Sequence, residues 1–170
     1  QRLLEQALAI EREGGVVREE GVTLGNLSNV ALDLGDYAKA RAYCEDAIEC
    51  HRAVGNRYNE GMQLLGLANA AIGEQRWELA VEHADQALVP LQAIGNLPAI
   101  SAVRMRHGFA AQMQGHFDEA ERHYQLAIAD ANHGNYPELV GWNEMWLGVL
   151  YAQRKRPREA HGFLERGLGG

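Results

Sequence analysis

The feature that most constrains the fold of this 170-residue chain is an internal repeat with a period of 40 residues. Alanine recurs at this spacing in two columns, and large aromatic and aliphatic residues recur with it. The columns comprise Ala7, Ala47, Ala87 and Ala127; Ala40, Ala80, Ala120 and Ala160; Tyr37, Trp77 and Phe117; and Leu27, Leu67 and Leu147. A period of this length indicates supersecondary units that stack side by side and bury a shared core.

Each repeat has the apolar spacing of two helices. In the repeat that begins near Asn56, apolar residues and one asparagine follow each other at intervals of three or four positions, at Met62, Leu65, Asn69 and Ile72. This spacing is typical of one face of an α-helix. A break over residues 73–76 precedes a second periodic stretch, from Trp77 to about Ile94, which predicts the second helix.

Turn residues support these helix boundaries. Three predicted connections contain a glycine followed by an asparagine, at Gly55-Asn56, Gly95-Asn96 and Gly134-Asn135. The glycine tolerates the positive φ that ends a helix, and the asparagine side chain accepts the first N–H groups of the next helix. Pro90 lies inside a predicted helix, and we expect it to kink that helix.

The sequence therefore predicts an all-α fold, a right-handed α-solenoid of antiparallel helix pairs. No segment sustains the alternation of apolar and polar residues that is typical of a half-buried strand. We expect a single domain over residues 1–170, in which residues 1–14 form the second helix of an incomplete unit. Four repeats are expected to follow, at about residues 15–54, 55–94, 95–133 and 134–170.

The repeat columns resemble the tetratricopeptide repeat. That family has large and small residues in a first helix (helix A), then a turn, then an aromatic residue and alanines in a second helix (helix B). One repeat matches this pattern with Leu24, Leu27, Ser28, Ala31, Gly35, Tyr37, Ala40, Cys44 and Ala47. Arg52, Gln92 and Asn132 stand where the family has its closing proline, and the 40-residue unit exceeds the family's usual 34. Repeats of this length resemble those of kinesin light chains, Leu-Gly-Asn-repeat adaptors and sensor regions of bacterial transcription regulators.

The resemblance implies that the A helices line a concave groove that binds peptides. The outward face of these helices is largely apolar and contains three methionines, a composition typical of adaptable recognition surfaces. The candidate peptide-binding residues are Asn26, Asn29, Met62, Leu65, Asn69, Met105, Arg106, Phe109, Gln112, Trp142, Met145 and Trp146. Asn29 and Asn69 can clamp a peptide backbone, and Arg106 can hold a carboxylate. Alternatively, this face is buried by the curvature of the superhelix or by a neighbouring chain.

The residue pattern predicts no catalytic, cofactor-binding or metal site. The seven histidines are scattered, and His116 and His123 have no carboxylates at metal-ligand spacing. Cys44 occupies a core column, so we expect a buried, inert thiol there and a more open one at Cys50. His107 replaces the leucine of the other repeats, which indicates either a hydrogen-bonded residue in a wetter interface or a polar feature that serves a ligand.

Composition excludes several classes of partner. The net charge of −7 disfavours nucleic acid, because binding the phosphate backbone requires a concentrated basic surface. Apolar runs are far shorter than the ~20 residues needed to span a bilayer, and no secretory signal is evident at the N-terminus. We therefore expect a cytoplasmic protein with no membrane partner.

Three functional hypotheses remain. The leading one is a non-catalytic module, part of a larger bacterial protein, whose concave groove binds a peptide or a partner domain. The excess of arginine over lysine favours the bacterial origin. The second is a homo-oligomerisation scaffold, in which the apolar stripe and the open solenoid ends form a homodimer. The third is an enzyme that uses histidine or cysteine.

Overall fold

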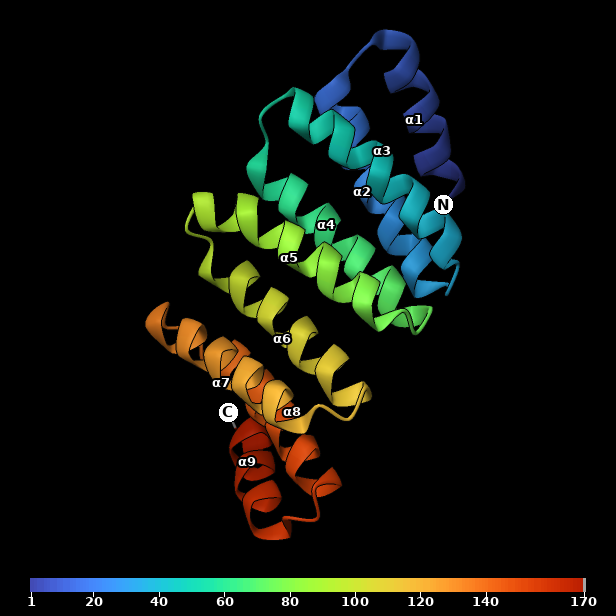
Figure 1. Ribbon diagram of the computed structural model, residues 1–170. Helices are drawn as coiled ribbons and strands as arrows, with labels where there is room; N and C mark the ends of the chain where they lie inside the picture. Colours follow the sequence, from blue (N-terminus) through green and yellow to red (C-terminus); the bar gives the residue numbers. More distant parts are fainter. Residues whose placement is uncertain (170) are drawn as a thin grey trace. The chain divides into compact units, whose positions relative to one another are not determined.

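The structure is a computed structural model that describes residues 1–169, and it is all-α, as the sequence predicts (Figure 1). In this described part, successive helices pack as antiparallel pairs, which is the packing of the predicted solenoid. None of these helices is both long enough and apolar enough to cross a membrane. The helices are α1 (Arg2–Gly14), α2 (Val17–Asp33), α3 (Tyr37–Ala53), α4 (Arg57–Gly73), α5 (Trp77–Ala93), α6 (Leu97–Met113), α7 (Phe117–His133), α8 (Pro137–Gln153) and α9 (Pro157–Gly169).

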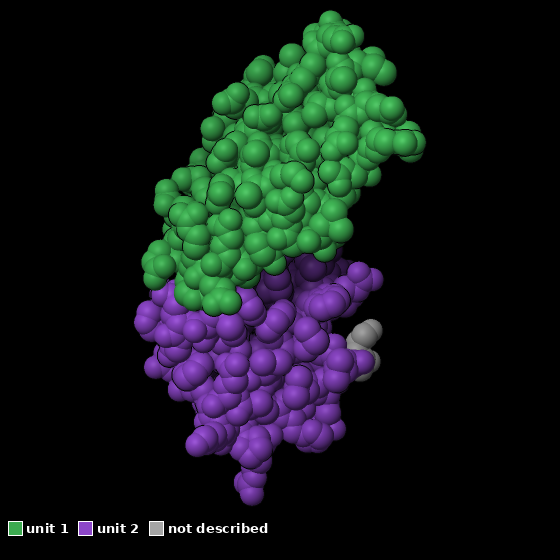
Figure 2. Space-filling model, turned by 90° about the vertical axis from the view of Figure 1, so that its right-hand side faces the viewer, with its two compact units in different colours: residues 1–94 green, residues 95–170 purple. Residues whose placement is uncertain are grey.

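The helices belong to two compact units, residues 1–94 and residues 95–170 (Figure 2). The first unit contains α1 to α5, and the second contains α6 to α9. Helices α2, α4, α6 and α8 are the A helices of their pairs, and α3, α5, α7 and α9 are the B helices. The boundary between the units falls where the sequence predicts the second repeat to end. The single domain and the repeat limits stay predictions.

Two of the predicted glycine-asparagine turns are confirmed. Gly55 and Gly95 adopt positive φ values of 68° and 63°. The side chains of Asn56 and Asn96 then cap α4 and α6 by accepting backbone N–H bonds at 3.2 and 3.0 Å. These caps satisfy N–H groups that have no partner within their helix, and they define the residues at which α4 and α6 begin.

The prediction for the third turn is wrong. Gly134 has a φ of −83°, and Asn135 takes the positive φ, at 58°. Tyr136 is the N-cap residue of α8 and makes no side-chain cap bond. The ring of Tyr136 packs against Gly134, where a Cβ atom would lie 2.3 Å from the ring. Any larger residue at position 134 would displace this ring, and asparagine supplies the left-handed conformation, which it tolerates better than most residues.

Pro90 lies within α5, which runs from Trp77 to Ala93 without a break in its helical assignment. Its side chain is buried. Proline has no N–H to donate to the carbonyl four residues earlier, so the predicted kink has a physical basis and stays a prediction.

The alanine columns form the centre of the core. Seven of these alanines are at most 5% exposed: Ala40, Ala47, Ala80, Ala87, Ala120, Ala127 and Ala160. Large side chains fill the remaining space, including Leu24 and Leu27 in the first unit and Tyr124 and Leu147 in the second. The small columns let helix backbones approach each other closely, which explains why the period is visible in the sequence.

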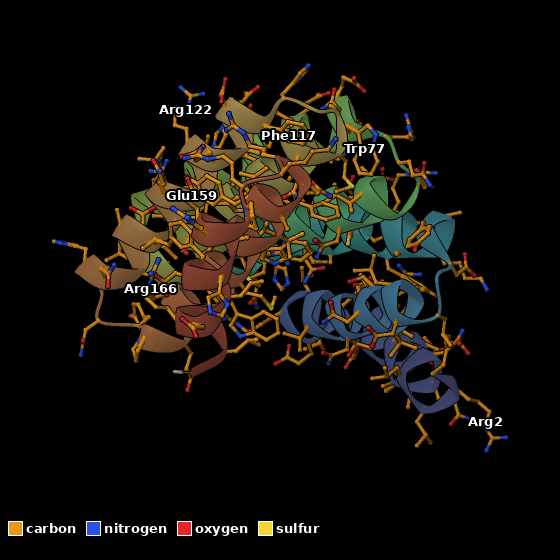
Figure 3. The ribbon with its side chains drawn as sticks, turned by 90° about the horizontal axis from the view of Figure 1, so that it is seen from below. Arg2, Trp77, Phe117, Arg122, Glu159 and Arg166 are labelled. Carbon is orange, nitrogen blue, oxygen red and sulfur yellow. The ribbon has the colours of Figure 1, made fainter. Side chains whose placement is uncertain are left out.

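Charged side chains lie mainly on the outside of each unit. Arg2 on α1 and Arg122 on α7 extend away from their helices (Figure 3). Glu60 is an exception, because it is only 4% exposed and its two oxygens accept bonds from Arg52 and Arg57 at 2.7 and 3.1 Å. This buried carboxylate is paired with two exposed arginines, and such pairing is what a buried charge requires.

Candidate functional site

An apolar cavity of about 370 Å³ lies between the two A helices of the second unit, α6 and α8. We call it the α6/α8 cavity. Its lining comprises Ser101, Ala102, Met105, Arg106, Leu139, Trp142, Asn143 and Trp146. Four of these residues are candidates from the sequence: Met105, Arg106, Trp142 and Trp146. The volume lies within the range of roughly 300–1,000 Å³ that is usual for binding pockets.

Aromatic side chains form much of the cavity wall. The rings of Phe109 on α6 and Trp146 on α8 meet edge to face, with centroids 5.2 Å apart and an interplanar angle of 75°. Such an edge-to-face contact stabilises the observed orientation of the Trp146 ring beside the cavity. Trp142, one turn earlier on α8, is 60% exposed, so most of its ring is available to a partner.

A buried series of hydrogen bonds connects the helices that form the cavity. The Asn143 side chain donates from Nδ2 to the Leu139 carbonyl at 2.7 Å and to Ser101 Oγ at 3.3 Å. Ser101 in turn donates from Oγ to the Ala127 carbonyl on α7 at 3.0 Å. Asn143 and Ser101 are 2% and 0% exposed. These bonds connect α8 to α6 and α6 to α7 next to the aromatic residues of the cavity.

Sequence reasoning missed Ser101 and Asn143, although the repeat contains a signal for one of them. Asn143 lies two periods after Gln63, another amide residue. In the first unit, Gln63 on α4 accepts a bond at 3.1 Å from Ser28 Oγ on α2. An amide in this column therefore bridges neighbouring A helices in both units. Asn143 is one methylene shorter than glutamine and also donates to the Leu139 carbonyl of its own helix.

Arg106 is the charged residue of the α6/α8 lining. Its guanidinium donates from Nη1 to the Ala102 carbonyl at 3.2 Å. Burial lowers the pKa of Arg106, because a cation is disfavoured where water is excluded. The guanidinium remains protonated near neutral pH, since arginine cannot be deprotonated in proteins.

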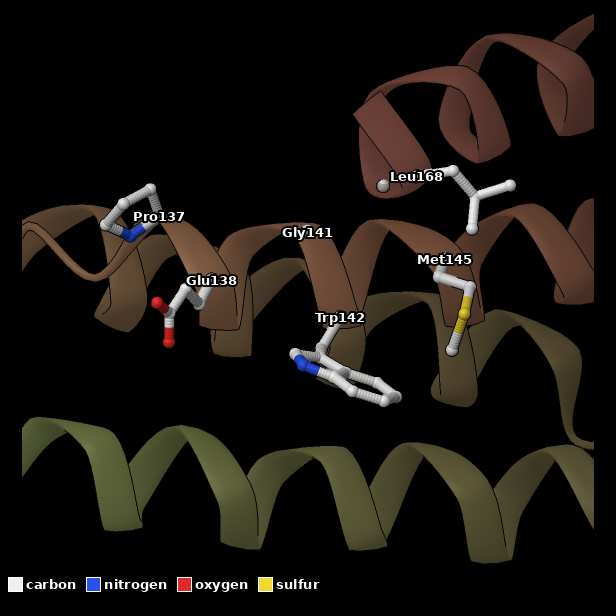
Figure 4. Close-up of a pocket in the computed structure, with 7 residues that line it drawn as sticks. Pro137, Glu138, Gly141, Trp142, Met145 and Leu168 are labelled. Carbon is white, nitrogen blue, oxygen red and sulfur yellow. The ribbon is translucent and has the colours of Figure 1, made fainter. Parts of the chain in front are cut away.

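A second cavity, of about 310 Å³, lies between α8 and α9, and we call it the α8/α9 cavity. Figure 4 shows Glu138, Trp142 and Met145 extending from the same side of α8, with Leu168 of α9 reaching toward Met145. The full lining is Pro137, Glu138, Gly141, Trp142, Met145, Gly167 and Leu168. Trp142 thus lines both cavities.

The candidates of the first unit lie on its A helices. Asn26 and Asn29 are exposed on α2, whereas Met62 and Asn69 are half-buried on α4. Leu65 is 3% exposed and belongs to the core. Four of the five candidates in this unit are therefore accessible to some degree.

Gln112, a candidate of the second unit, is also part of the packing, because it is only 3% exposed. Its Oε1 accepts a bond from the Tyr124 hydroxyl at 2.8 Å, and its Nε2 donates to Gln153 at 2.8 Å. This amide links α6 to its B helix α7 and to α8. It therefore has a structural role that its position in the sequence pattern does not indicate.

The cysteines and histidines singled out in the sequence differ in burial: Cys44 and His107 are buried, whereas His116 is exposed. Cys44 is fully buried, and burial raises the pKa of its thiol to about 11, whereas Cys50 is more open, as predicted. His107 is 6% exposed, and its ring centroid lies 5.0 Å from that of His123. His107 therefore belongs to the contact between α6 and α7.

A comparison with family models gives the repeat type. The model described as tetratricopeptide repeat matches residues 19–88. This chain carries tetratricopeptide repeats. The match covers α3 and α4 in full and most of α2 and α5, so the helix pairs of the first unit are tetratricopeptide repeats. No curated protein matches the sequence significantly.

Solved structures share this fold at low sequence identity. A Rap protein complexed with competence and sporulation factor is 17% identical, with a TM-score of 0.81, and the match covers 89% of this chain and 42% of that one. The tetratricopeptide-repeat sensor protein of the STAND class from Pyrococcus horikoshii is 19% identical, with a TM-score of 0.78 and coverages of 98% and 26%. A putative kinesin light chain from Podosopora anserina is 18% identical, with a TM-score of 0.75 and coverages of 99% and 83%.

These matches confirm the predicted structural resemblance to kinesin light chains and to a repeat sensor. At such identities they show the fold alone. This chain spans 55% of RapI and 42% of the Rap protein complexed with competence and sporulation factor, which are both considerably longer.

Proposed function

We propose that this tetratricopeptide-repeat chain is a non-catalytic protein–protein interaction module, part of a larger bacterial protein, whose A helices bind a peptide or a segment of a partner domain. The observation that carries the proposal is the α6/α8 cavity, where Trp142 is 60% exposed beside Met105 and Trp146. Tryptophan and arginine are the residue types that most often dominate binding energy at protein interfaces. The peptide-bound Rap structure, a relative in fold, supports a peptide as the ligand.

Selection from a library of random displayed peptides tests this function. Peptides captured by the wild-type chain are synthesised with a fluorescent label, and their affinities are measured by anisotropy. We expect Trp142→Ala to weaken binding by about tenfold or more, which corresponds to ~1.4 kcal/mol.

Leu126→Ala is the matched control for that experiment. Leu126 is a large apolar residue that is 40% exposed on α7, a B helix of the same unit. Its truncation is expected to leave the affinity unchanged. Failure to select any peptide, or equal losses in both variants, would contradict binding on the A helices.

A homo-oligomerisation scaffold is the second candidate. Helix α1 exposes Leu3 and Ile10 at 76% and 70%, so it offers apolar surface that a second copy can cover. Light scattering across a concentration series tests this reading. A dimer that Leu3→Glu with Ile10→Glu converts to a monomer would favour the scaffold, whereas a wild-type monomer at every concentration would exclude it.

A further inference from the structure

Two arginines of the second unit show how an aromatic ring and a carboxylate together hold a guanidinium. The first is Arg156, whose guanidinium carbon lies 4.7 Å from the centroid of the Tyr151 ring. Its Nε and Nη2 both donate to Glu159 Oε1, at 3.0 and 2.8 Å. Arg156 and Glu159 are exposed, so the arrangement forms in contact with water. A flat guanidinium suits it, because it can stack on a ring and bond a carboxylate at the same time.

Arg166 on α9 repeats this arrangement with other partners. Its guanidinium carbon lies 4.5 Å from the centroid of the Phe163 ring, and its Nε donates to Glu144 Oε1 on α8 at 2.6 Å. The two arginines use different rings and different spacings along the chain. What they share is therefore chemical, namely a ring face next to a glutamate carboxylate.

Trp142 and Glu138 on α8 offer the same two groups. They are one helical turn apart, a spacing at which Cβ atoms lie about 5–6 Å from each other, and their side chains extend from the same side of α8 (Figure 4). Trp142 is 60% exposed, and Glu138 is exposed as well. Within residues 1–169, no arginine or lysine stacks on this ring or pairs with this carboxylate. Both groups are thus accessible to a guanidinium from another molecule.

We propose that the α8/α9 cavity binds an arginine side chain of the partner peptide, an inference that rests on the proposed peptide-binding function. The guanidinium lies over the Trp142 ring and donates two N–H bonds to the Glu138 carboxylate. A lysine binds there more weakly, because its ammonium group is not planar and does not donate two parallel bonds.

The rest of the α8/α9 lining suits the aliphatic part of an arginine. Met145 and Leu168 supply apolar side chains, and Leu168 is 76% exposed. Gly141 and Gly167 contribute backbone alone, and Glu138 is the charged member of the lining. Arginine packs its methylene stem along apolar surface while its head group stays at a polar edge. An apolar side chain would fill the same cavity but would leave the carboxylate without a partner, so the lining favours a basic residue.

Neighbouring carboxylates already have partners within the second unit. Glu144, the next acidic residue along α8, bonds Arg166. On α9, Glu165 Oε1 lies 3.1 Å from His161 Nε2. Glu138 is therefore the carboxylate that determines the charge preference of the α8/α9 cavity.

The test uses peptides that the wild-type chain selects from the random library. We expect these peptides to share an arginine whose replacement by citrulline, a neutral residue of the same shape, weakens binding about tenfold, since both the ion pair and the cation–π contact are lost. Replacement by lysine is expected to weaken binding less. Glu138→Gln is expected to weaken binding of the arginine peptide about fivefold and to leave that of the citrulline peptide unchanged, because the citrulline peptide has no charge to pair.

Glu78→Gln is the matched control, because Glu78 is exposed on α5 in the first unit and the chemical change is the same. It is expected to preserve the affinity for both peptides. Circular dichroism and urea unfolding of each variant ensure that a loss of binding is not a loss of fold.

The outcomes separate this inference from the proposed function. If no peptide is selected, or Trp142→Ala binds as well as the wild type, the peptide-binding function itself fails. If binding depends on Trp142 but the peptides share no arginine, or Glu138→Gln weakens the arginine and citrulline peptides equally, only the arginine inference is overturned. A dimer in light scattering that Trp142→Ala disrupts would show that a second copy covers this surface, which also overturns it.

Discussion

Asn143 on α8 donates a hydrogen bond to Ser101 on α6, with 3.3 Å between Nδ2 and Oγ. The serine hydroxyl in turn donates a hydrogen bond to the Ala127 carbonyl of α7, with 3.0 Å between the two oxygens. Because Asn143 and Ser101 are 2% and 0% exposed, water cannot replace a missing partner without entering the core. This pair therefore helps to hold both walls of the α6/α8 cavity in place.

Ser101→Ala is expected to lower the free energy of unfolding by about 1–3 kcal/mol, because it leaves Asn143 Nδ2 with one fewer acceptor and the Ala127 carbonyl without this donor. Urea unfolding followed by circular dichroism measures the change. Gln125→Ala removes an exposed amide that bonds Glu121 at 3.3 Å, and it is expected to change stability by less than about 0.5 kcal/mol. Equal effects of the two variants would show that the buried chain contributes no more than a surface bond.

Two glycines of α9 provide a matched pair of substitutions. A Cβ on Gly167 would lie 2.7 Å from the Gly141 carbonyl and 2.8 Å from the Met145 backbone nitrogen, so α9 would have to move away from α8. A Cβ on Gly162 would have Arg166 Nη1, at 3.7 Å, as its nearest neighbour. We expect Gly167→Ala to destabilise by about 1–3 kcal/mol and Gly162→Ala to stabilise by up to about 1 kcal/mol.

Urea midpoints of both variants check this pair of predictions. Gly167→Ala should also alter the fluorescence of Trp142, which lines the cavity next to the α8/α9 crossing. A neutral or stabilising Gly167→Ala would mean that the two helices are less closely packed there than the structure shows.

The fold follows from the sequence because its determinants are local and periodic. Alanines that recur every 40 residues mark the places where helices touch. The side chains of Asn56 and Asn96 cap the helices that follow them, so these helix starts can be predicted from residue type alone. The conformation of the turn at Gly134 could not be predicted in this way, since that glycine has a negative φ and lies against the Tyr136 ring. A steric requirement of this kind depends on how a neighbouring side chain is oriented, which the pattern does not contain.

The candidate site is only partly predictable for a similar reason. The helical spacing places Met105, Trp142 and Trp146 on the outward face of their A helices, and these residues do line one cavity. The same spacing includes Gln112, but the Tyr124 hydroxyl, twelve positions later, binds its side chain inside the fold. The Asn143 side chain bonds to a neighbouring helix. A prediction made from the outward face of each helix does not include residues of this kind.

The two cysteines should differ in reactivity. Burial raises the pKa of Cys44 to about 11 and also raises that of Cys50, but only Cys44 is fully buried. At about pH 8, we expect a thiol reagent to label Cys44→Ser rapidly through Cys50, and Cys50→Ser only as fast as the chain opens. Labelling in denaturing urea should make the two variants equal. Rapid labelling of folded Cys50→Ser would show that Cys44 is accessible.

His123 lies in surroundings that disfavour its protonated form. Burial is the main cause that lowers its pKa, and His107 and Arg104 on α6 and Arg122 on its own helix lower it further. Glu119, whose Oε1 lies 3.9 Å from His123 Nε2, acts in the opposite direction but does not compensate. The folded state therefore keeps this imidazole neutral at a pH where a free histidine begins to take up a proton.

Acidification is consequently expected to destabilise the chain. A pKa lowered in the folded state means that the unfolded chain binds more protons once the pH falls below about 6.5, so the free energy of unfolding decreases there and reaches a plateau above it. His51 contributes with the same sign, because burial lowers its pKa as well. Urea midpoints at about pH 7.5 and about pH 5.5 measure the loss. His123→Gln should reduce the loss, whereas Gln125→Ala should preserve it. An unchanged loss in His123→Gln would show that other groups cause the acid sensitivity.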